Sequence, residues 1–438
     1  MSKAVWFAGV AAAMVMAGSV QAQGLPVSQV PAAKSYDAAV FAQAKALQPK
    51  VIAWRRDLHE HPELSNNEVR TAKVVADHLR ALGMEVRTGV AKTGVVGILK
   101  GGKPGKVVAL RADMDALPVA EQTGLPFASK VTAQYNGQTV PVMHACGHDS
   151  HVAILMGAAE ILASMKDDIE GTVVFVFQPA EEGPPMGEEG GAPLMVKEGV
   201  LKNPKVDAIF GLHVFPGPVG ALVWRPGPMM AASDRYEIEL KGRQAHGSTP
   251  WVGIDMSSLT ADIVTAFNQI AARQVNVSKT PTVLTVATLH GGLRYNIIPE
   301  DLTMTGTLRT FDPGMRTDVI ARAEKAVSSI SERYGATAKF NWGTPNPVTD
   351  NNRDLTAQMK PTLARASQGL VKDDIDFIMG AEDFSYFQKE IPGFFYHLGV
   401  GNPKGANHSP FFDVDERAME TGVRAQALMA LDFLKSGG

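Results

Sequence analysis

The spacing of apolar residues changes several times along the chain, and each change predicts a different element. Apolar positions recur at helical intervals over 36–47, 49–59 and 67–82, and Gly83 closes the last of these helices. Strand-like runs follow over 84–90, 94–100 and 106–111. The next helix has apolar side chains at Ile154, Leu155, Ala158, Ile161, Leu162 and Met165. Residues 171–177 then form a nearly continuous apolar run, which is typical of a strand buried on both faces. This part of the chain is therefore predicted to be an α/β unit with a mixed sheet flanked by helices.

A second unit begins at about residue 229. Its predicted strands cover 235–241, 281–289, 302–309 and 336–342, and its predicted helices cover 255–273 and 314–334. This βαββαβ order is that of the split βαβ, ferredoxin-like motif. A helix over 350–368, a buried strand over 394–400 and a last helix over 414–434 then return to the first unit. We expect a discontinuous catalytic domain, 36–228 and 343–438, and an inserted α+β domain, 229–342.

The N-terminus has the pattern of a targeting segment. Lys3 precedes an apolar run over 4–17, and small residues follow it up to Ala22. We expect residues 1–22 to be a signal peptide that is cleaved after Ala22, which predicts a periplasmic or secreted protein with no membrane attachment after cleavage. The alternative is an uncleaved membrane anchor, for which the apolar run is short.

Composition excludes several classes of protein. A net charge of -3 over 438 residues, with 20% charged residues and no basic run, argues against a nucleic-acid binder. The length predicts two domains. Cys146 is the one cysteine, so the exported chain has no internal disulfide.

Candidate chemistry starts at 144–151, where three histidines and an aspartate surround Cys146. In an extended segment alternate side chains share a face, so Cys146 and His148 can point into one site. A thiolate and an imidazole that converge suit a divalent transition metal, zinc first. The alternative is a buried, inert cysteine beside surface histidines.

Other ligand-type residues follow predicted strands. Glu181 and Glu182 come after the strand over 171–177, His213 ends an apolar run over 208–214, and His408 follows the strand over 394–400. Strand ends are where open α/β sheets bind ligands. Each residue has a structural alternative, such as a loop glutamate or a core histidine.

Together, five candidate ligands exceed what one four-coordinate structural zinc uses. They are Cys146, His148, Glu182, His213 and His408. Two metal ions with a shared ligand would use all five, and such a pair lowers the pKa of a water and polarises a carbonyl. Glu181, adjacent to a ligand, is then the candidate general base, and the predicted reaction is hydrolysis of an amide or peptide.

Eight ordered motifs resemble those of the aminoacylase and carboxypeptidase family of two-metal peptidases. They are RADMDALP, MHACGHDSH, QPAEE, GLHV, HGSTP, GG followed by NIIP, GAEDF and NHSP. Within that family the chain is similar to the amidohydrolase branch, which contains hippurate hydrolases, N-acyl-amino-acid amidohydrolases and plant auxin-conjugate hydrolases. The resemblance implies the same five ligands, Glu181 as general base, and a lid and dimerisation role for the inserted domain.

The resemblance also implies roles that spacing does not provide. His246 would stabilise the oxyanion and could enter the site of a partner subunit in a homodimer. Asn296 and Arg309 would bind the free carboxylate of the substrate. The alternatives are a turn histidine beside Gly247 and a surface ion pair for Arg309.

One departure from the wider family concerns the metals. The chain has Asp113 and Asp115 where other branches have a His-x-Asp motif, and Cys146 replaces a bridging aspartate. Both aspartates are therefore expected to support the ligands. A thiolate favours zinc, and manganese, cobalt and nickel stay open.

The resulting hypothesis is an exported, metal-dependent amidohydrolase that converts N-acyl amino acids, including hippurate-like ones, to a carboxylic acid and a free amino acid. The nearest alternative is a dipeptidase or carboxypeptidase with the same two-metal chemistry. A non-catalytic periplasmic binding protein is the alternative from a different class.

Overall fold

The protein is described by a computed structural model, which covers residues 29–343, 345–401 and 404–436. The predicted signal peptide, residues 1–22, lies outside the described residues. None of the helices within these ranges combines the length and the apolar character that a membrane span needs.

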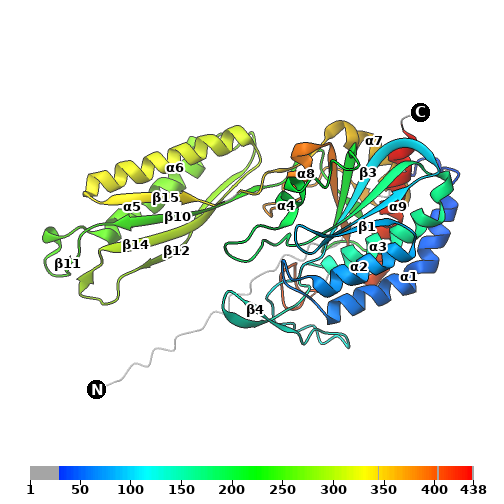
Figure 1. The fold of residues 1–438 in the computed structure, drawn as a ribbon. Coiled ribbons are helices and arrows are strands. Elements are labelled where there is room, and N and C mark those ends of the chain that lie inside the picture. Colours follow the sequence, from blue (N-terminus) through cyan, green and yellow to red (C-terminus); the bar gives the residue numbers. More distant parts are fainter. Residues whose placement is uncertain (1–28, 344, 402–403, 437–438) are drawn as a thin grey trace, which may run out of the picture.

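An eight-stranded mixed sheet forms the centre of the larger unit (Figure 1). Its strands in spatial order are β1 (Glu85–Val90), β2 (Gly94–Lys100), β6 (Glu170–Gln178), β3 (Lys103–Asp113), β7 (Ala208–Phe215), β18 (Gly393–Gly399), β8 (Leu222–Val223) and β17 (Val371–Lys372). β6, β3, β7 and β18 run parallel to one another. Their carboxyl ends therefore lie at one edge of the sheet, which is the edge where such sheets bind ligands. The predicted fold class, a mixed sheet flanked by helices, is confirmed.

Helices cover both faces of this sheet. Helices α1 (Asp37–Glu60), α3 (His148–Ser164) and α9 (Met419–Lys435) pack together on one face, with α2 (Val69–Ala81) beside β1 and α7 (Arg353–Ala366) against α9. Helices α4 (Gly191–Lys197) and α8 (Ser385–Glu390) lie on the opposite side (Figure 1). Strands buried on both faces explain the continuous apolar runs in the sequence.

The prediction of two helices over 36–59 is wrong, because α1 is one helix with Pro49 inside it. A proline in a helix interior costs about 3 kcal/mol. Val40, Val51 and Leu58 are fully buried along the same helix, and each such side chain contributes roughly 1.5–3 kcal/mol. Packing against α3 and α9 therefore outweighs the proline.

A second, antiparallel sheet has the order β12 (Thr282–Gly291), β14 (Asp301–Thr310), β10 (Ala232–Lys241) and β15 (Thr337–Trp342). Helices α5 (Met256–Gln269) and α6 (Pro313–Tyr334) cover one of its faces, over Tyr236, Ile238 and Leu240. The short strands β11 (Ala245–His246) and β13 (Ile297–Ile298) pair at the end of this unit that is far from the large sheet (Figure 1). The domain limits 36–228 with 343–438 and 229–342 stay predictions.

Two short pairs of antiparallel strands complete the described part of the fold. They are β4 (Thr132–Tyr135) with β5 (Gln138–Pro141), and β9 (Gly227–Met230) with β16 (Thr349–Asn351).

A candidate metal centre at the carboxyl ends of the central strands

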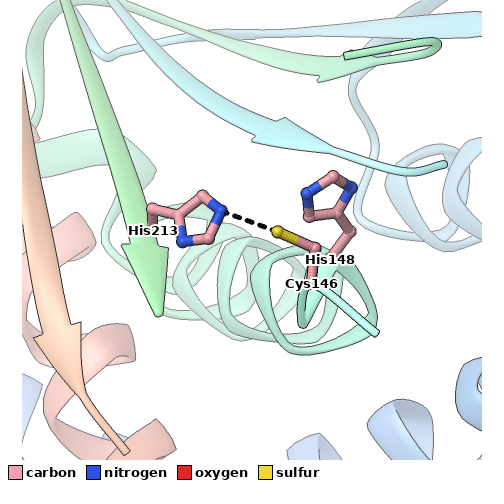
Figure 2. Close-up of side chains that lie close together, drawn as sticks. All are labelled: Cys146, His148 and His213. Atoms are coloured by element: carbon pink, nitrogen blue, oxygen red, sulfur yellow. Dashed lines mark hydrogen bonds between the residues drawn. The ribbon is translucent and has the colours of Figure 1, made fainter. Parts of the chain in front are cut away.

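Cys146, His148 and His213 form the centre of the candidate site. The first two come from the segment that enters α3, and His213 comes from the end of β7, so that all three side chains point toward one another (Figure 2). Their ligand atoms lie within 4.8 Å of one another, and the Cys146 Sγ to His213 Nε2 distance is 3.3 Å. Three potential metal donors thus converge from two distant parts of the chain.

Backbone carbonyls fix the orientation of both imidazole rings. His148 Nδ1 lies 2.8 Å from the carbonyl oxygen of Asp115, and His213 Nδ1 lies 2.6 Å from that of Val214. Because a carbonyl only accepts hydrogen bonds, each Nδ1 must be the donor. Each Nε2 therefore has its lone pair available, which is the arrangement that metal-binding histidines use.

Glu182 and His408 join the same cluster through Cys146. Ligand atoms of these three residues lie within 4.8 Å of one another, and His408 Nε2 is 3.0 Å from Glu182 Oε1. A further group of this kind contains His148, Glu181 and Glu182. The structure therefore brings all five sequence-predicted ligands, and Glu181, into overlapping groups.

Asp115 fixes the backbone of the two glutamates. Its carboxylate accepts hydrogen bonds from the backbone N–H groups of Glu181 (3.1 Å) and Glu182 (3.0 Å), and from the hydroxyl of Ser65 (2.8 Å). Ala180, directly before them, has a positive φ of 51°. The turn that presents both glutamates is thus fixed by a buried carboxylate.

Asp113 and His151 connect the elements that carry the ligands. His151 Nε2 accepts a hydrogen bond from the Val214 N–H (2.8 Å), so its Nδ1–H donates to Asp113 (2.5 Å). Burial alone opposes ionisation of Asp113, but Arg111 and His148 hold the pKa of its carboxyl well below the ordinary value. His151 therefore has no nitrogen left for a metal, and both residues hold the segments that carry the ligands in place.

Negative charge exceeds positive charge in this region. The buried guanidinium of Arg111 contacts Asp113 (2.6 Å), Glu382 (2.9 Å) and Asp383 (3.2 Å). Ligand-type oxygens of Asp113, Glu382 and Glu181 also lie within 4.8 Å of one another. Burial raises the pKa of Glu181 well above its usual range, and the carboxylates of Glu382 and Glu182 add to that effect. A divalent cation would offset this charge.

Two buried atoms in the cluster have no hydrogen-bond partner among the described residues, namely His148 Nε2 and Glu182 Oε1. Glu182 Oε1 does lie 3.0 Å from His408 Nε2, as an ion-pair contact. Buried polar atoms without partners are rare in folded proteins. These two unpaired atoms could each bind a metal. Together with the excess of carboxylates and the mixture of thiolate, imidazole and carboxylate groups, they fit divalent transition metals.

The residues assigned to substrate contacts lie in two places. Arg309 lines a cavity of about 1110 Å³ together with Cys146, Glu181 and His408. His246 and Asn296 do not line it, because they lie on β11 and before β13 at the far end of the second sheet (Figure 1). There the Gly247 N–H donates to the Asn296 carbonyl. Within one chain, the structure therefore does not bring His246 and Asn296 to the metal centre.

Sequence reasoning missed His397 and the carboxylates of 382–383. His397, on β18 directly opposite His213, is buried and lines the cavity, and its Nε2 has no hydrogen-bond partner in the described part of the chain. Burial lowers its pKa to about 3, with a contribution from His151. A histidine near the end of an apolar strand was the signal that identified His213, and the same signal was present here.

Comparison with known proteins gives similar sequences and folds. A profile described as "Peptidase family M20/M25/M40" matches residues 109–432. Thermostable carboxypeptidase 2 of Saccharolobus solfataricus is 42% identical, over 89% of this chain and 96% of its own length. N-acetylcysteine deacetylase of Bacillus subtilis is 37% identical, over 90% and 99%. The crystal structure of Bacillus subtilis YXEP, described as a dinuclear metal binding peptidase, has a TM-score of 0.75 at 36% identity, over 90% and 99% of the two chains.

Proposed function

Because this chain belongs to peptidase family M20/M25/M40 and is a hydrolase of amide or peptide bonds, we propose that it is an exported hydrolase of N-acyl amino acids. The products are a carboxylic acid and a free amino acid. The observation that carries the proposal is the convergence of five metal donors and Glu181 in a cavity that also contains Arg309. The family assignment removes the non-catalytic binding protein from consideration.

Two divalent ions are the proposed cofactors. Cys146, His148, Glu182, His213 and His408 would hold them, and Cys146 belongs to two of the groups of converging ligand atoms. When bound, the metals supply Lewis-acid activation of water and of the scissile carbonyl. The thiolate favours zinc over manganese, cobalt and nickel.

Glu181 is the proposed general base. Its carboxylate lies in the same group as His148 and Glu182, and it accepts a long hydrogen bond of 3.4 Å from the Asp383 backbone N–H. In this position it takes a proton from the attacking water and delivers it to the nitrogen of the leaving amine.

Substrate contacts come from the second unit. Arg309 is the proposed partner of the free carboxylate, since a guanidinium binds a carboxylate through two parallel hydrogen bonds. His246 and Asn296 are proposed to reach the site from the other subunit of a homodimer, with His246 stabilising the oxyanion. The distance of β11 from the cavity in one chain supports this arrangement (Figure 1).

The second candidate is a carboxypeptidase or dipeptidase, which the name of the 42% identical relative favours. Relatives named N-acetylcysteine deacetylase and IAA-amino acid hydrolase support the first candidate. Hydrolysis of N-acetyl, N-benzoyl and longer N-acyl amino acids should be compared with hydrolysis of dipeptides. A preference for dipeptides would replace the first candidate with the second.

Glu181→Gln is the test of the mechanism. We expect hydrolysis to fall at least about a hundredfold, in line with loss of a general base, while metal analysis of the protein gives the wild-type content. Hydrolysis that survives with the metals bound would refute the assignment. Sequencing the N-terminus of the exported protein tests cleavage after Ala22.

A further inference from the structure

The face of the second sheet that the helices leave uncovered carries two arginines. Along β10 the buried positions Tyr236, Ile238 and Leu240 face α5 and α6, so Ser233 and Arg235 lie on the opposite face. Ser233 pairs with Arg309 on β14, and Arg235 pairs with Thr307. Arg235 and Arg309 are therefore diagonal neighbours on one face, with Cα atoms roughly 7–8 Å apart, within reach of one small ligand.

Both arginines line the cavity of the metal centre. Lys197 also lines it, but both oxygens of Glu189 lie 2.8 Å from its ammonium group. Neither guanidinium group has a hydrogen bond or an ion pair to another residue in the described ranges, although charged neighbours are paired elsewhere on this sheet, such as Lys339 with Glu239. The cavity thus contains two guanidinium groups that are available to anions.

The carboxylate of Asp234 does not neutralise the positive charge of Arg309. Asp234 is adjacent in space, but it points to the other face and forms a bidentate pair with Arg316, at 2.5 and 2.8 Å. Burial lowers the pKa of Arg309, and the attraction of Asp234 offsets only part of that effect. A half-buried cation of this kind is stabilised when a carboxylate binds to it.

We propose that the amino acid part of the substrate is acidic, so that the enzyme prefers N-acyl glutamate or aspartate. This rests on the proposed function, in which Arg309 binds the α-carboxylate. Arg235 then binds the side-chain carboxylate. A substrate with one carboxylate would leave one of the two guanidinium groups without a partner.

The test compares N-acetylglutamate with N-acetylglutamine, which has nearly the same shape but lacks the second charge. For the wild-type enzyme we expect kcat/KM to be about tenfold to a hundredfold higher for the glutamate substrate, as expected for a charge-assisted hydrogen bond. Arg235→Gln should remove this preference, by lowering kcat/KM for N-acetylglutamate about tenfold to a hundredfold more than for N-acetylglutamine. Lys339→Gln is the matched control, because Lys339 lies on the same open face of the sheet without lining the cavity, and it should keep the preference.

Other results would overturn the proposal. An equal loss on both substrates in Arg235→Gln, with the thermal unfolding midpoint unchanged, would mean that both arginines bind the α-carboxylate. Equal wild-type activity on both substrates would refute the acidic preference and leave the proposed function intact. If the enzyme cleaves no N-acyl amino acid, the proposed function fails, and the same comparison of glutamate with glutamine at the carboxyl end of dipeptides tests the arginine pair alone.

Discussion

Gly147, between the candidate ligands Cys146 and His148, is the residue whose replacement tests the geometry of the site most directly. Its φ is 92°, a conformation that residues with a side chain rarely adopt. A Cβ atom there would lie 2.4 Å from Val214 Cγ2 and 3.3 Å from Phe412 Cε1. Gly147→Ala therefore introduces both backbone strain and a steric clash at the centre of the ligand cluster.

The two effects can be given magnitudes. The left-handed backbone costs roughly 1–2 kcal/mol for alanine, and a methyl group forced into a packed core costs about 1–3 kcal/mol more. We expect the free energy of unfolding to fall by about 2–5 kcal/mol. Val214 cannot move freely, because its N–H donates to His151 and its carbonyl accepts from His213. Displacing Val214 would also shift the imidazole ring of His213, which is one of the five predicted metal ligands.

Urea unfolding and metal content per subunit provide the assay. Gly83→Ala is the matched control, since Gly83 also has a positive φ of 76°, but a Cβ atom there would meet none of the described residues within 4 Å. It should lose only the backbone contribution of roughly 1–2 kcal/mol and keep its metals. If Gly147→Ala matches Gly83→Ala in stability and binds metal like the wild type, the close contact between position 147 and Val214 contributes neither to stability nor to the geometry of the ligands. That result would refute the prediction.

Three further predictions concern charge and assembly. Asp149→Asn removes the charge of the fully buried one of the three carboxylates that pair with Arg55, 2.9 Å away, and should destabilise the protein by about 1.5–3 kcal/mol in thermal or urea unfolding. Burial alone would lower the pKa of His59, but hydrogen bonds to two carboxylates outweigh it and raise that pKa. Its contribution to stability is therefore complete below the unfolded pKa of about 6.5 and is lost as pH rises through the folded pKa, so His59→Gln should lower the unfolding midpoint more at about pH 6 than at about pH 9. Finally, mixing and refolding inactive His246→Ala with inactive Glu181→Gln should restore roughly a quarter of the activity if subunits exchange and His246 acts across a dimer, whereas a mixture that stays inactive while heterodimers form contradicts that role.

The parts of the site that could be predicted from the sequence are those that local pattern determines. His213 and Glu182 follow apolar strands, and parallel strands bring their carboxyl ends together whatever the remaining topology is. The segment over 144–151 could be recognised because ligand-type residues are dense there. These residues therefore needed no knowledge of tertiary packing.

Other features depend on packing and could not be predicted. The continuity of α1 through Pro49 follows from burial against two helices that are far away in the sequence. The separation of His246 from the cavity follows from the length of the second sheet, which no motif encodes. Arg235 becomes a candidate only when the strand register places it diagonal to Arg309.

Backbone strain links the fold to the proposed chemistry. Three segments that carry candidate ligands contain a residue with positive φ: Gly147, Ala180 with 51°, and His408 with 70°. For the two residues with side chains this conformation costs of order 1–3 kcal/mol each. The surrounding contacts must therefore impose it, and Asp115 does so for the turn after Ala180 by accepting two backbone N–H groups. Metal binding would be favoured only when all of these segments are in place, so folding and metal affinity are coupled. The two glutamates are positioned by Asp115, which does not line the cavity.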